Sequence, residues 1–203
     1  MQPTYVSPDR DIFTVESIFT EDECQSLIRQ GEAMGFEAAS VTTDSGAQMM
    51  PNVRNNDRVV YDDAAFAASL WERVKAYVPQ QIDGYPAVGL NERLRLYRYD
   101  PGQRFKRHQD GRVYTADGRV SRLSSLIYLN AGYKGGETIV REYTTVDDQT
   151  IKHEFIITAE AGKGLFFIHE RKHEGTVIRS GRKYLLRTDV MYAGAPQDGA
   201  ATD

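Results

Sequence analysis

Two histidines and one aspartate have the residue types and spacing of a metal site. His108 and Asp110 are separated by one residue in a segment typical of a β-strand, where side chains at i and i+2 lie on the same side. A third ligand must come from a distant segment, and we choose His173. Two histidines and one carboxylate suit ferrous iron. They leave coordination positions that a bidentate 2-oxo acid and O2 could occupy.

The chain has four histidines, and the short His-x-Asp pattern alone is a weak signal. His169, four residues before His173, is a competing third ligand. His153 lies in a polar stretch, where an ordinary surface histidine is expected. We prefer His173 because of the basic residues that follow it.

Those basic residues could bind the far end of a dicarboxylate. Lys183 lies ten residues after His173, beyond a Ser180-Gly181 turn, so a hairpin would bring it back beside the histidine strand. Its ammonium could make a charge-assisted contact with a carboxylate. Arg187 lies four residues further on the same strand face and could bind a carboxylate bidentately. Either residue could serve.

Tyr99 and Tyr128 are candidate hydroxyl donors to the same dicarboxylate. Both fall in segments typical of strands, and aromatic residues often fill a core from such positions. A packing role and a binding role are therefore equally compatible with the pattern.

The sequence predicts two helices followed by short strands. The helices are expected after Thr20 as far as Gly35, and over 62–78, where apolar residues recur at helical spacing. Strands are expected at 93–99, 105–110, 121–129, 137–143, 154–158, 164–168, 175–179 and 183–192. This order predicts a mainly β fold, a barrel or jelly roll with N-terminal helices outside it. We expect one domain over 1–203, with a helical part at about 1–90 and a catalytic barrel at about 91–192.

Composition narrows the class of protein. The net charge of −4, with 40% hydrophobic and 27% charged residues, is typical of a globular protein and gives no indication of nucleic-acid binding. The single cysteine, Cys24, cannot form an internal disulfide. No signal peptide or membrane span is visible. We therefore expect a cytoplasmic protein, and the sequence makes no prediction of its oligomeric state.

Three groups of residues resemble one known family. They are Tyr99-x-x-Gly102-x-x-Phe105-x-x-His108-x-Asp110, then Leu126-Ile127-Tyr128-Leu129-Asn130 followed by Gly135-Gly136-Glu137-Thr138, and finally His173-Glu174-Gly175 followed by Lys183-Tyr184. In order and spacing they resemble the prolyl 4-hydroxylase-type 2-oxoglutarate/Fe(II)-dependent dioxygenase superfamily. The resemblance covers about 92–192, roughly half of the chain.

The resemblance implies a double-stranded β-helix (jelly roll) with iron at one mouth. It implies Fe(II), 2-oxoglutarate and O2 as cofactor and co-substrates, with ascorbate as the reductant. By position, it identifies His108, Asp110 and His173 as the metal ligands and Lys183 as the residue that binds the C5 carboxylate of 2-oxoglutarate. It places Tyr128, Tyr99 and Thr138 in the 2-oxoglutarate pocket. Arg187 has no fixed role in the pattern and is kept as a secondary co-substrate residue.

The resemblance also implies hydroxylation of an unactivated C–H bond. Related halogenases have a small residue in place of the carboxylate, so Asp110 favours hydroxylation. The substrate is expected to be a protein or peptide side chain, and a free amino acid or small metabolite is the alternative. We expect Arg54, Asn56, Arg58 and Arg122 at the pocket entrance, although 51–58 could equally be a solvated loop.

Two other classes of protein share these residue types. A jelly-roll binding module without catalysis predicts that the histidines and the aspartate do not converge. A zinc hydrolase could use the same three ligands. No separate general base stands out nearby, and a hydrolase leaves the position of Lys183 unexplained.

Overall fold

The computed structural model describes residues 3–7, 11–43 and 46–193 of the chain. Its helices are α1 (Glu21–Met34) and α2 (Ala64–Val74). The strands before residue 91 are β1 (Thr4–Tyr5), β2 (Ile12–Val15), β3 (Glu37–Ala38), β4 (Val41–Thr43), β5 (Gly46–Gln48), β6 (Asp57–Asp62), β7 (Gln81–Ile82) and β8 (Tyr85–Leu90). The later strands are β9 (Arg93–Tyr99), β10 (Phe105–His108), β11 (Arg119–Tyr128), β12 (Lys134–Gly135), β13 (Thr138–Val146), β14 (Gln149–Ile157), β15 (Gly164–Ile168), β16 (Lys172–Gly175), β17 (Ile178–Ser180) and β18 (Lys183–Ala193).

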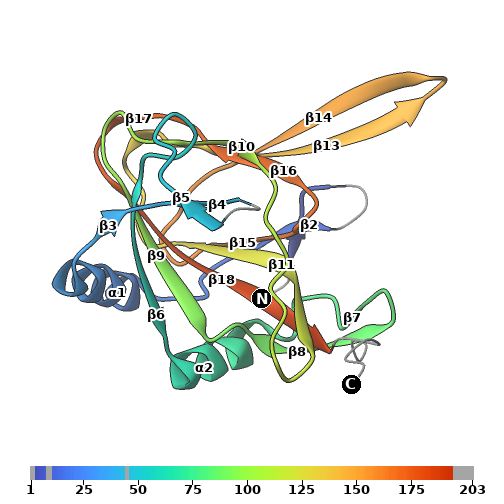
Figure 1. Ribbon diagram of the computed structural model, residues 1–203, viewed down its shortest axis with the longest axis horizontal. Coiled ribbons are helices and arrows are strands. Elements are labelled where there is room, and N and C mark those ends of the chain that lie inside the picture. Colours follow the sequence, from blue (N-terminus) through green and yellow to red (C-terminus); the bar gives the residue numbers. More distant parts are fainter. Residues whose placement is uncertain (1–2, 8–10, 44–45, 194–203) are drawn as a thin grey trace.

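Two antiparallel sheets form the body of the protein (Figure 1). The larger sheet has the strand order β1-β2-β15-β11-β18-β9-β6-β3, and β8 also pairs with β18. The smaller sheet has the order β10-β16-β13-β14. The prediction of a mainly β protein is confirmed at this level.

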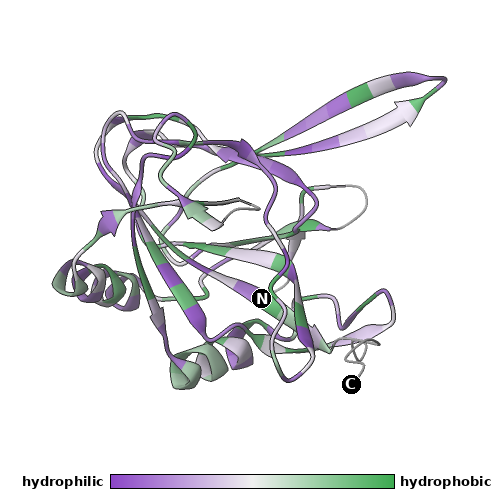
Figure 2. Cartoon of the chain, viewed as in Figure 1, coloured by the Kyte–Doolittle hydropathy of each residue, from purple (hydrophilic) through white to green (hydrophobic). Residues whose placement is uncertain are grey.

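One face of the larger sheet packs against the two helices. Alternate residues of its central strands, such as Leu94 and Leu96 of β9 and Leu186 of β18, are buried with Leu27 of α1 and Leu70 of α2. This alternation follows from the period of two in a β-strand. In Figure 2 it is visible as alternating hydrophilic and hydrophobic bands along β9.

The opposite face of the larger sheet looks toward the smaller sheet. A second core cluster there contains Tyr97 and Tyr99 of β9, Tyr128 of β11 and Leu185 of β18, packed with Val140 of β13. Residues of one parity on each strand therefore line the space between the sheets.

The first helix begins as the sequence predicts. Thr20 accepts a hydrogen bond from the Glu23 amide, and the Glu23 carboxylate accepts one from the Thr20 amide, which is a complete capping box. The second helix is shorter than the predicted 62–78. Asp63 is its N-cap, and it ends at Val74 because the chain turns before Val78, which is still buried.

The sequence did not reveal the strands of the N-terminal part. β2 extends the larger sheet beyond β15, and β6 pairs with β9 along its whole length. Both strands are short, and β6 runs almost directly into α2, so the periodicity of each is too brief to be distinguished from its surroundings. Val41–Thr43 and Gly46–Gln48, where no strand was predicted, pair with each other as β4 and β5.

The hairpin of β13 and β14 is longer than predicted and extends away from the body of the protein (Figure 1). At its base β13 pairs with β16, which carries His173. Among the described residues, neither helix has the length and apolar character needed to cross a membrane.

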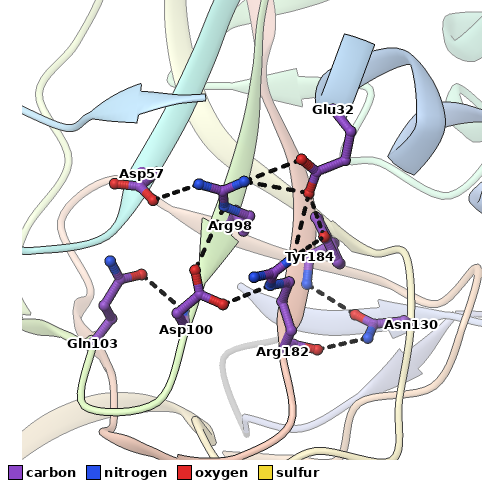
Figure 3. A network of polar contacts seen from close by, with 8 residues as sticks. All are labelled: Glu32, Asp57, Arg98, Asp100, Gln103, Asn130, Arg182 and Tyr184. Atoms are coloured by element: carbon purple, nitrogen blue, oxygen red, sulfur yellow. Dashed lines mark hydrogen bonds and ion pairs between the residues drawn. The ribbon is translucent and has the colours of Figure 1, made fainter. Parts of the chain in front are cut away.

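A polar network fastens α1 to the larger sheet (Figure 3). Arg98 of β9 forms ion pairs with Glu32 of α1 at 3.0 Å and with Asp57 of β6 at 2.9 Å. Glu32 also accepts a hydrogen bond from the hydroxyl of Tyr184 on β18. These contacts are only partly exposed, so their loss leaves incompletely solvated charges behind.

We therefore expect Arg98→Met to lower the free energy of unfolding by about 1–3 kcal/mol. Urea unfolding measures this change. The control is Arg93→Met, which replaces an exposed residue of the same strand and is expected to change stability by about 0.5 kcal/mol or less. Equal effects of the two substitutions would contradict a fastening role for the network.

Candidate metal centre and pocket

The three predicted metal ligands converge at one end of the space between the sheets. β10 and β16 pair so that His108 lies directly opposite His173. Asp110 lies two residues beyond the end of β10, and not within the strand as predicted. One donor atom from each residue lies within 4.8 Å of the others. The Asp110 carboxylate lies 3.7 Å from Nε2 of His108 and 3.6 Å from Nε2 of His173.

Both imidazole rings are oriented with Nε2 toward this centre. The Nδ1–H of His108 donates to the carbonyl of Lys106, and that of His173 donates to the carbonyl of Arg171. A carbonyl can only accept, so Nε2 is the nitrogen with a free lone pair in each neutral ring. Hydrogen bonds of this kind orient histidine ligands in metal sites.

The charge states also suit a metal ion. Burial, reinforced by neighbouring His173, lowers the pKa of His108 to about 3, and burial lowers the pKa of His173. Burial raises the pKa of Asp110, but Arg187 and the two histidines outweigh it and hold this pKa well below its ordinary value. Two neutral imidazoles and one carboxylate are the protonation states that a divalent ion requires. This donor set fits ferrous iron.

A chain of buried hydrogen bonds holds Asp110 in place. The hydroxyl of Ser124 donates to Asp110, and the same oxygen contacts Nδ1 of His169 at 2.9 Å. Nε2 of His169 lies 2.9 Å from the hydroxyl of Ser121, which accepts from the amide of Val113. His169 therefore lies behind the aspartate, and the structure does not bring it into the group with His108 and His173.

Lys183 is buried at the opposite end of the pocket and is only 2% exposed. Its ammonium donates to the carbonyl of Gly136 at 2.7 Å and to the hydroxyl of Thr138 at 3.2 Å. An ammonium has three donors, so one remains for a ligand. Burial lowers the pKa of Lys183 to about 7, against the opposing effect of Glu137.

Three tyrosine rings surround the Lys183 ammonium. Its nitrogen lies 5.6 Å from the ring centre of Tyr99, 5.4 Å from that of Tyr128 and 5.8 Å from that of Tyr133. The hydroxyl groups of Tyr128 and Tyr133 are buried and make no hydrogen bond within the part of the chain that the structure describes. Buried hydroxyl groups normally have a partner, so these two indicate a place for a polar ligand.

One pocket of about 410 Å³, including its open mouth, joins the two ends. Its lining includes His108, Asp110 and His173 at one end and Tyr99, Thr138 and Lys183 at the other. Along β18, Lys183, Leu185 and Arg187 face the pocket in turn, so about 13 Å of strand separates the first from the last. Arg187 lies at the metal end, where it forms an ion pair with Asp110 at 3.1 Å.

None of the four residues predicted at the entrance lines the pocket itself, and they differ in whether they contact residues that do. Arg54 lies over the rings of Tyr97 and Phe105, two lining residues, and its Nε donates to Asn56. Arg58 lies opposite Tyr97 in the sheet and donates to Ser40.

The expectation for Arg122 needs correction. Its side chain pairs with Asp83 and lies over the ring of Tyr85, and Arg122 is not among the residues that line the pocket. The register of β11 explains the difference. Ser124 and Leu126 share the inner face of this strand, and the irregularity between Ser121 and Leu123 separates Arg122 from that alternation. We no longer include Arg122 in the substrate site.

Sequence reasoning missed several residues of this site. Tyr97 lines the pocket, Tyr133 lies beside Lys183, and Ser124 contacts Asp110. Parity could have identified Tyr97, because it lies two residues before Tyr99 on the same strand. No comparable signal exists for Tyr133, which lies in a loop, or for Ser124, whose role depends on the pairing of β11.

The convergence of the three ligands argues against the binding module, which predicts that they stay apart. The pocket also argues against a zinc hydrolase. Apart from the ligand Asp110, the one carboxylate among the described lining residues is Glu174, and it is already paired with Arg141. It is therefore poorly placed to act as a general base for a bound water. The distant buried lysine has no part in such a reaction.

Part of the chain matches a known protein family. Residues 94–188 match the family described as the 2OG-Fe(II) oxygenase superfamily. No curated protein matches the chain.

Solved structures share the fold at low sequence identity. The viral collagen prolyl hydroxylase of Paramecium bursaria chlorella virus 1, in its 2OG complex, has a TM-score of 0.57 at 18% identity, over 89% of this chain and 96% of that chain. A Pseudomonas putida prolyl-4-hydroxylase has a TM-score of 0.60 at 19% identity, over 89% and 92%. A Trichoplax adhaerens prolyl hydroxylase, in complex with a peptide fragment of the hypoxia inducible factor oxygen degradation domain, has a TM-score of 0.64 at 13% identity, over 90% and 84%.

The geometry predicts different roles for the two neighbouring histidines. We expect His173→Ala to abolish binding of Fe(II), because it removes a ligand. His169→Gln, which affects only the support of Asp110, is expected to weaken binding by about 10- to 100-fold. Anaerobic titration with Fe(II) measures both. Strong binding by His173→Ala together with its loss in His169→Gln would show that the third ligand is wrongly assigned.

Proposed function

We propose that this chain, a 2-oxoglutarate-dependent dioxygenase by the match of residues 94–188 to the 2OG-Fe(II) oxygenase superfamily, hydroxylates an unactivated C–H bond of a protein or peptide side chain. One observation carries this proposal. A single pocket has two histidines and an aspartate at one end and a buried lysine at the other. That spacing suits a dicarboxylate held by a metal at one end and by a cation at the other.

In this proposal His108, Asp110 and His173 hold Fe(II), and Lys183 binds the C5 carboxylate of 2-oxoglutarate. The choice of Lys183 over Arg187 is supported by their partners. Arg187 is already paired with Asp110 and Asp189 at the metal end, whereas the hydrogen bonds of Lys183 to described residues go to neutral oxygens. Such a cation gains a full charge–charge contact when a carboxylate arrives.

The tyrosines and Thr138 orient the co-substrate. The unsatisfied hydroxyl of Tyr128 is a donor for a carboxylate oxygen beside Lys183, and the Tyr99 ring forms the wall next to it. Thr138 positions the ammonium. Iron with 2-oxoglutarate and O2 supplies the oxidising power, giving succinate and CO2 while one oxygen atom is inserted into the substrate bond.

A protein or peptide substrate is supported by the neighbouring structures, which are prolyl hydroxylases, one of them in complex with a peptide. A free amino acid or small metabolite is the second candidate. We also propose a double-stranded β-helix as the detailed fold, one domain over 1–203, and a cytoplasmic location.

Turnover without a primary substrate tests the reaction class. We expect anaerobically purified protein, given Fe(II), ascorbate and 2-oxoglutarate, to form succinate slowly once air is admitted. Asp110→Ala and Lys183→Ala are both expected to lose this activity, the first through metal binding and the second through co-substrate binding. Arg122→Met, outside the pocket, is the control and is expected to retain it. Succinate formation that persists in Asp110→Ala would rule out the proposed centre.

The pKa of Lys183 gives this enzyme a specific pH dependence. The free ammonium loses its proton near pH 7, and a bound carboxylate requires the charged form. The affinity for 2-oxoglutarate is therefore full below this pKa and falls as pH rises through it, by up to about tenfold per pH unit. Lys183→Arg, which stays charged, is expected to bind with no such slope.

Calorimetric titration of 2-oxoglutarate at several pH values, with Zn(II) in place of iron, measures both proteins. Wild-type affinity that is constant above neutral pH would contradict a role for the Lys183 ammonium in binding the co-substrate.

A further inference from the structure

Four arginine side chains gather around Tyr97 at the metal end of the pocket. In the sheet, Tyr97 of β9 lies opposite Arg58 of β6, and its neighbour Arg95 lies opposite Arg187 of β18. The guanidinium carbon of Arg54 lies 4.6 Å from the centre of the Tyr97 ring and 4.5 Å from that of Phe105. Phe105 in turn stacks on His108, so this basic group lies one ring away from a metal ligand.

Only two of these four arginines have carboxylate partners within the described residues. Arg187 pairs with Asp110 and Asp189, and Arg95 pairs with Asp189 at 3.3 Å. The partners of the other two are neutral. Arg54 donates to the amide oxygen of Asn56 at 2.7 Å, and Arg58 donates to the hydroxyl of Ser40 at 2.7 Å.

Of the two arginines without a carboxylate partner among the described residues, Arg54 is the more unusual. It is only 5% exposed, and one terminal nitrogen, Nη2, is buried without a hydrogen-bond partner among the described residues. A buried cation normally has an anionic partner, because water no longer solvates its charge. Iron(II) and the 2-oxoglutarate dianion bring equal and opposite charges, so their binding does not remove this excess.

The pKa of Tyr97 reflects the same excess of positive charge. Burial opposes ionisation of Tyr97, but Arg54, Arg187 and Arg95 outweigh it and lower the pKa of this phenol to about 8. Tyr99 lies two residues away on the same face, and burial raises its pKa. Arg54 and Arg187 act on both phenols, but Tyr97 also has Arg95 beside it and a hydrogen bond with Arg187, whereas Asp110 and Tyr97 oppose the arginines at Tyr99.

We propose that Arg54, Arg58 and Tyr97 form a subsite for a carboxylate group of the primary substrate. The inference rests on the proposed function and adds the chemical class of its substrate, which is an acidic molecule. The carboxylate lies beside Tyr97, where it compensates the positive charge of Arg54 and Arg58. An adjacent carbon of the substrate faces the metal centre.

Trifluoroacetate is the probe for this subsite, observed by fluorine NMR. The protein is loaded with Zn(II), which fills the metal site and supports no turnover. Saturating 2-oxoglutarate occupies Lys183. We expect binding to wild-type protein and at least about tenfold weaker binding to Arg54→Met, because a charge-assisted contact is lost. Arg58→Met, at a partly exposed position, gives the same direction of change and serves if Arg54→Met does not fold.

Arg122→Met is the matched control. Like Arg54, Arg122 lies over a tyrosine ring, but its partner Tyr85 does not line the pocket, whereas Tyr97 does. It is expected to leave trifluoroacetate binding unchanged. The proposal would be overturned if trifluoroacetate did not bind to the wild-type protein, or if the Arg54 and Arg58 variants both bound it as tightly as the wild-type protein does.

A second measurement separates charge from packing. The near-ultraviolet absorbance of the phenolate, taken as wild type minus Tyr97→Phe, gives the pKa of Tyr97. We expect trifluoroacetate to raise this pKa, and Arg54→Met to raise it without the anion. A purely structural Arg54, which only packs against the rings, predicts no effect of trifluoroacetate, and that result would also overturn the proposal.

Succinate formation then identifies the source of the carboxylate. Free amino acids are compared with their amides, and peptides containing Asp or Glu with peptides containing Asn or Gln. Greater stimulation by the carboxylate member of either pair supports the subsite and shows whether the carboxylate belongs to a free amino acid or to an acidic side chain of a peptide. Equal stimulation by the amides overturns it. Absence of succinate from every mixture contradicts the proposed reaction and not the subsite, which the trifluoroacetate titration tests independently.

Discussion

The register of β18 determines which side chains enter the pocket. Lys183, Leu185 and Arg187 share one parity and face the space between the sheets, whereas Leu186 and Val190, of the other parity, are buried against the helices. A shift of one residue in this strand exchanges the two sets, placing apolar side chains at the metal end and charges in the core under α1 and α2. The core beneath the helices therefore specifies the pocket, because only one register satisfies both faces.

Burial gives each charged residue of the pocket a defined state. The paired groups remain ionised, as with Asp110 beside Arg187, while Lys183, which has only neutral partners, titrates near neutral pH. The same physics keeps both imidazoles neutral. The site is therefore ready for a divalent ion at one end and for an anion at the other without any change of side-chain protonation at the metal ligands.

The sequence predicted the parts of this protein that depend on local pattern. The capping box at Thr20, most of the strands from Arg93 onward and the grouping of His108 with a distant His173 follow from spacing and residue type. The strand expected at 175–179 is β17 at Ile178–Ser180, and the sequence did not predict β12 or β16, the strand that carries His173. It did not predict the N-terminal strands, because β2 and β6 become strands only through their pairing with β15 and β9. The environment of Arg122 was missed for a related reason, since a single irregularity in β11 changes which face a residue occupies.

The ionic contacts of the pocket also explain why the metal centre and the sheet form one unit. Negative and positive side chains alternate from the metal ligand into the sheet, in the order Asp110, Arg187, Asp189 and Arg95. Asp189 is fully buried. Removing any member leaves its neighbour as an uncompensated charge in a region with little solvent, which costs more than the pair contributes. This chain is balanced at every step, so it needs no ligand. Arg54 lies beside it without a carboxylate, and the same principle that accounts for the chain therefore leaves Arg54 as the position where the pocket requires an anion from outside.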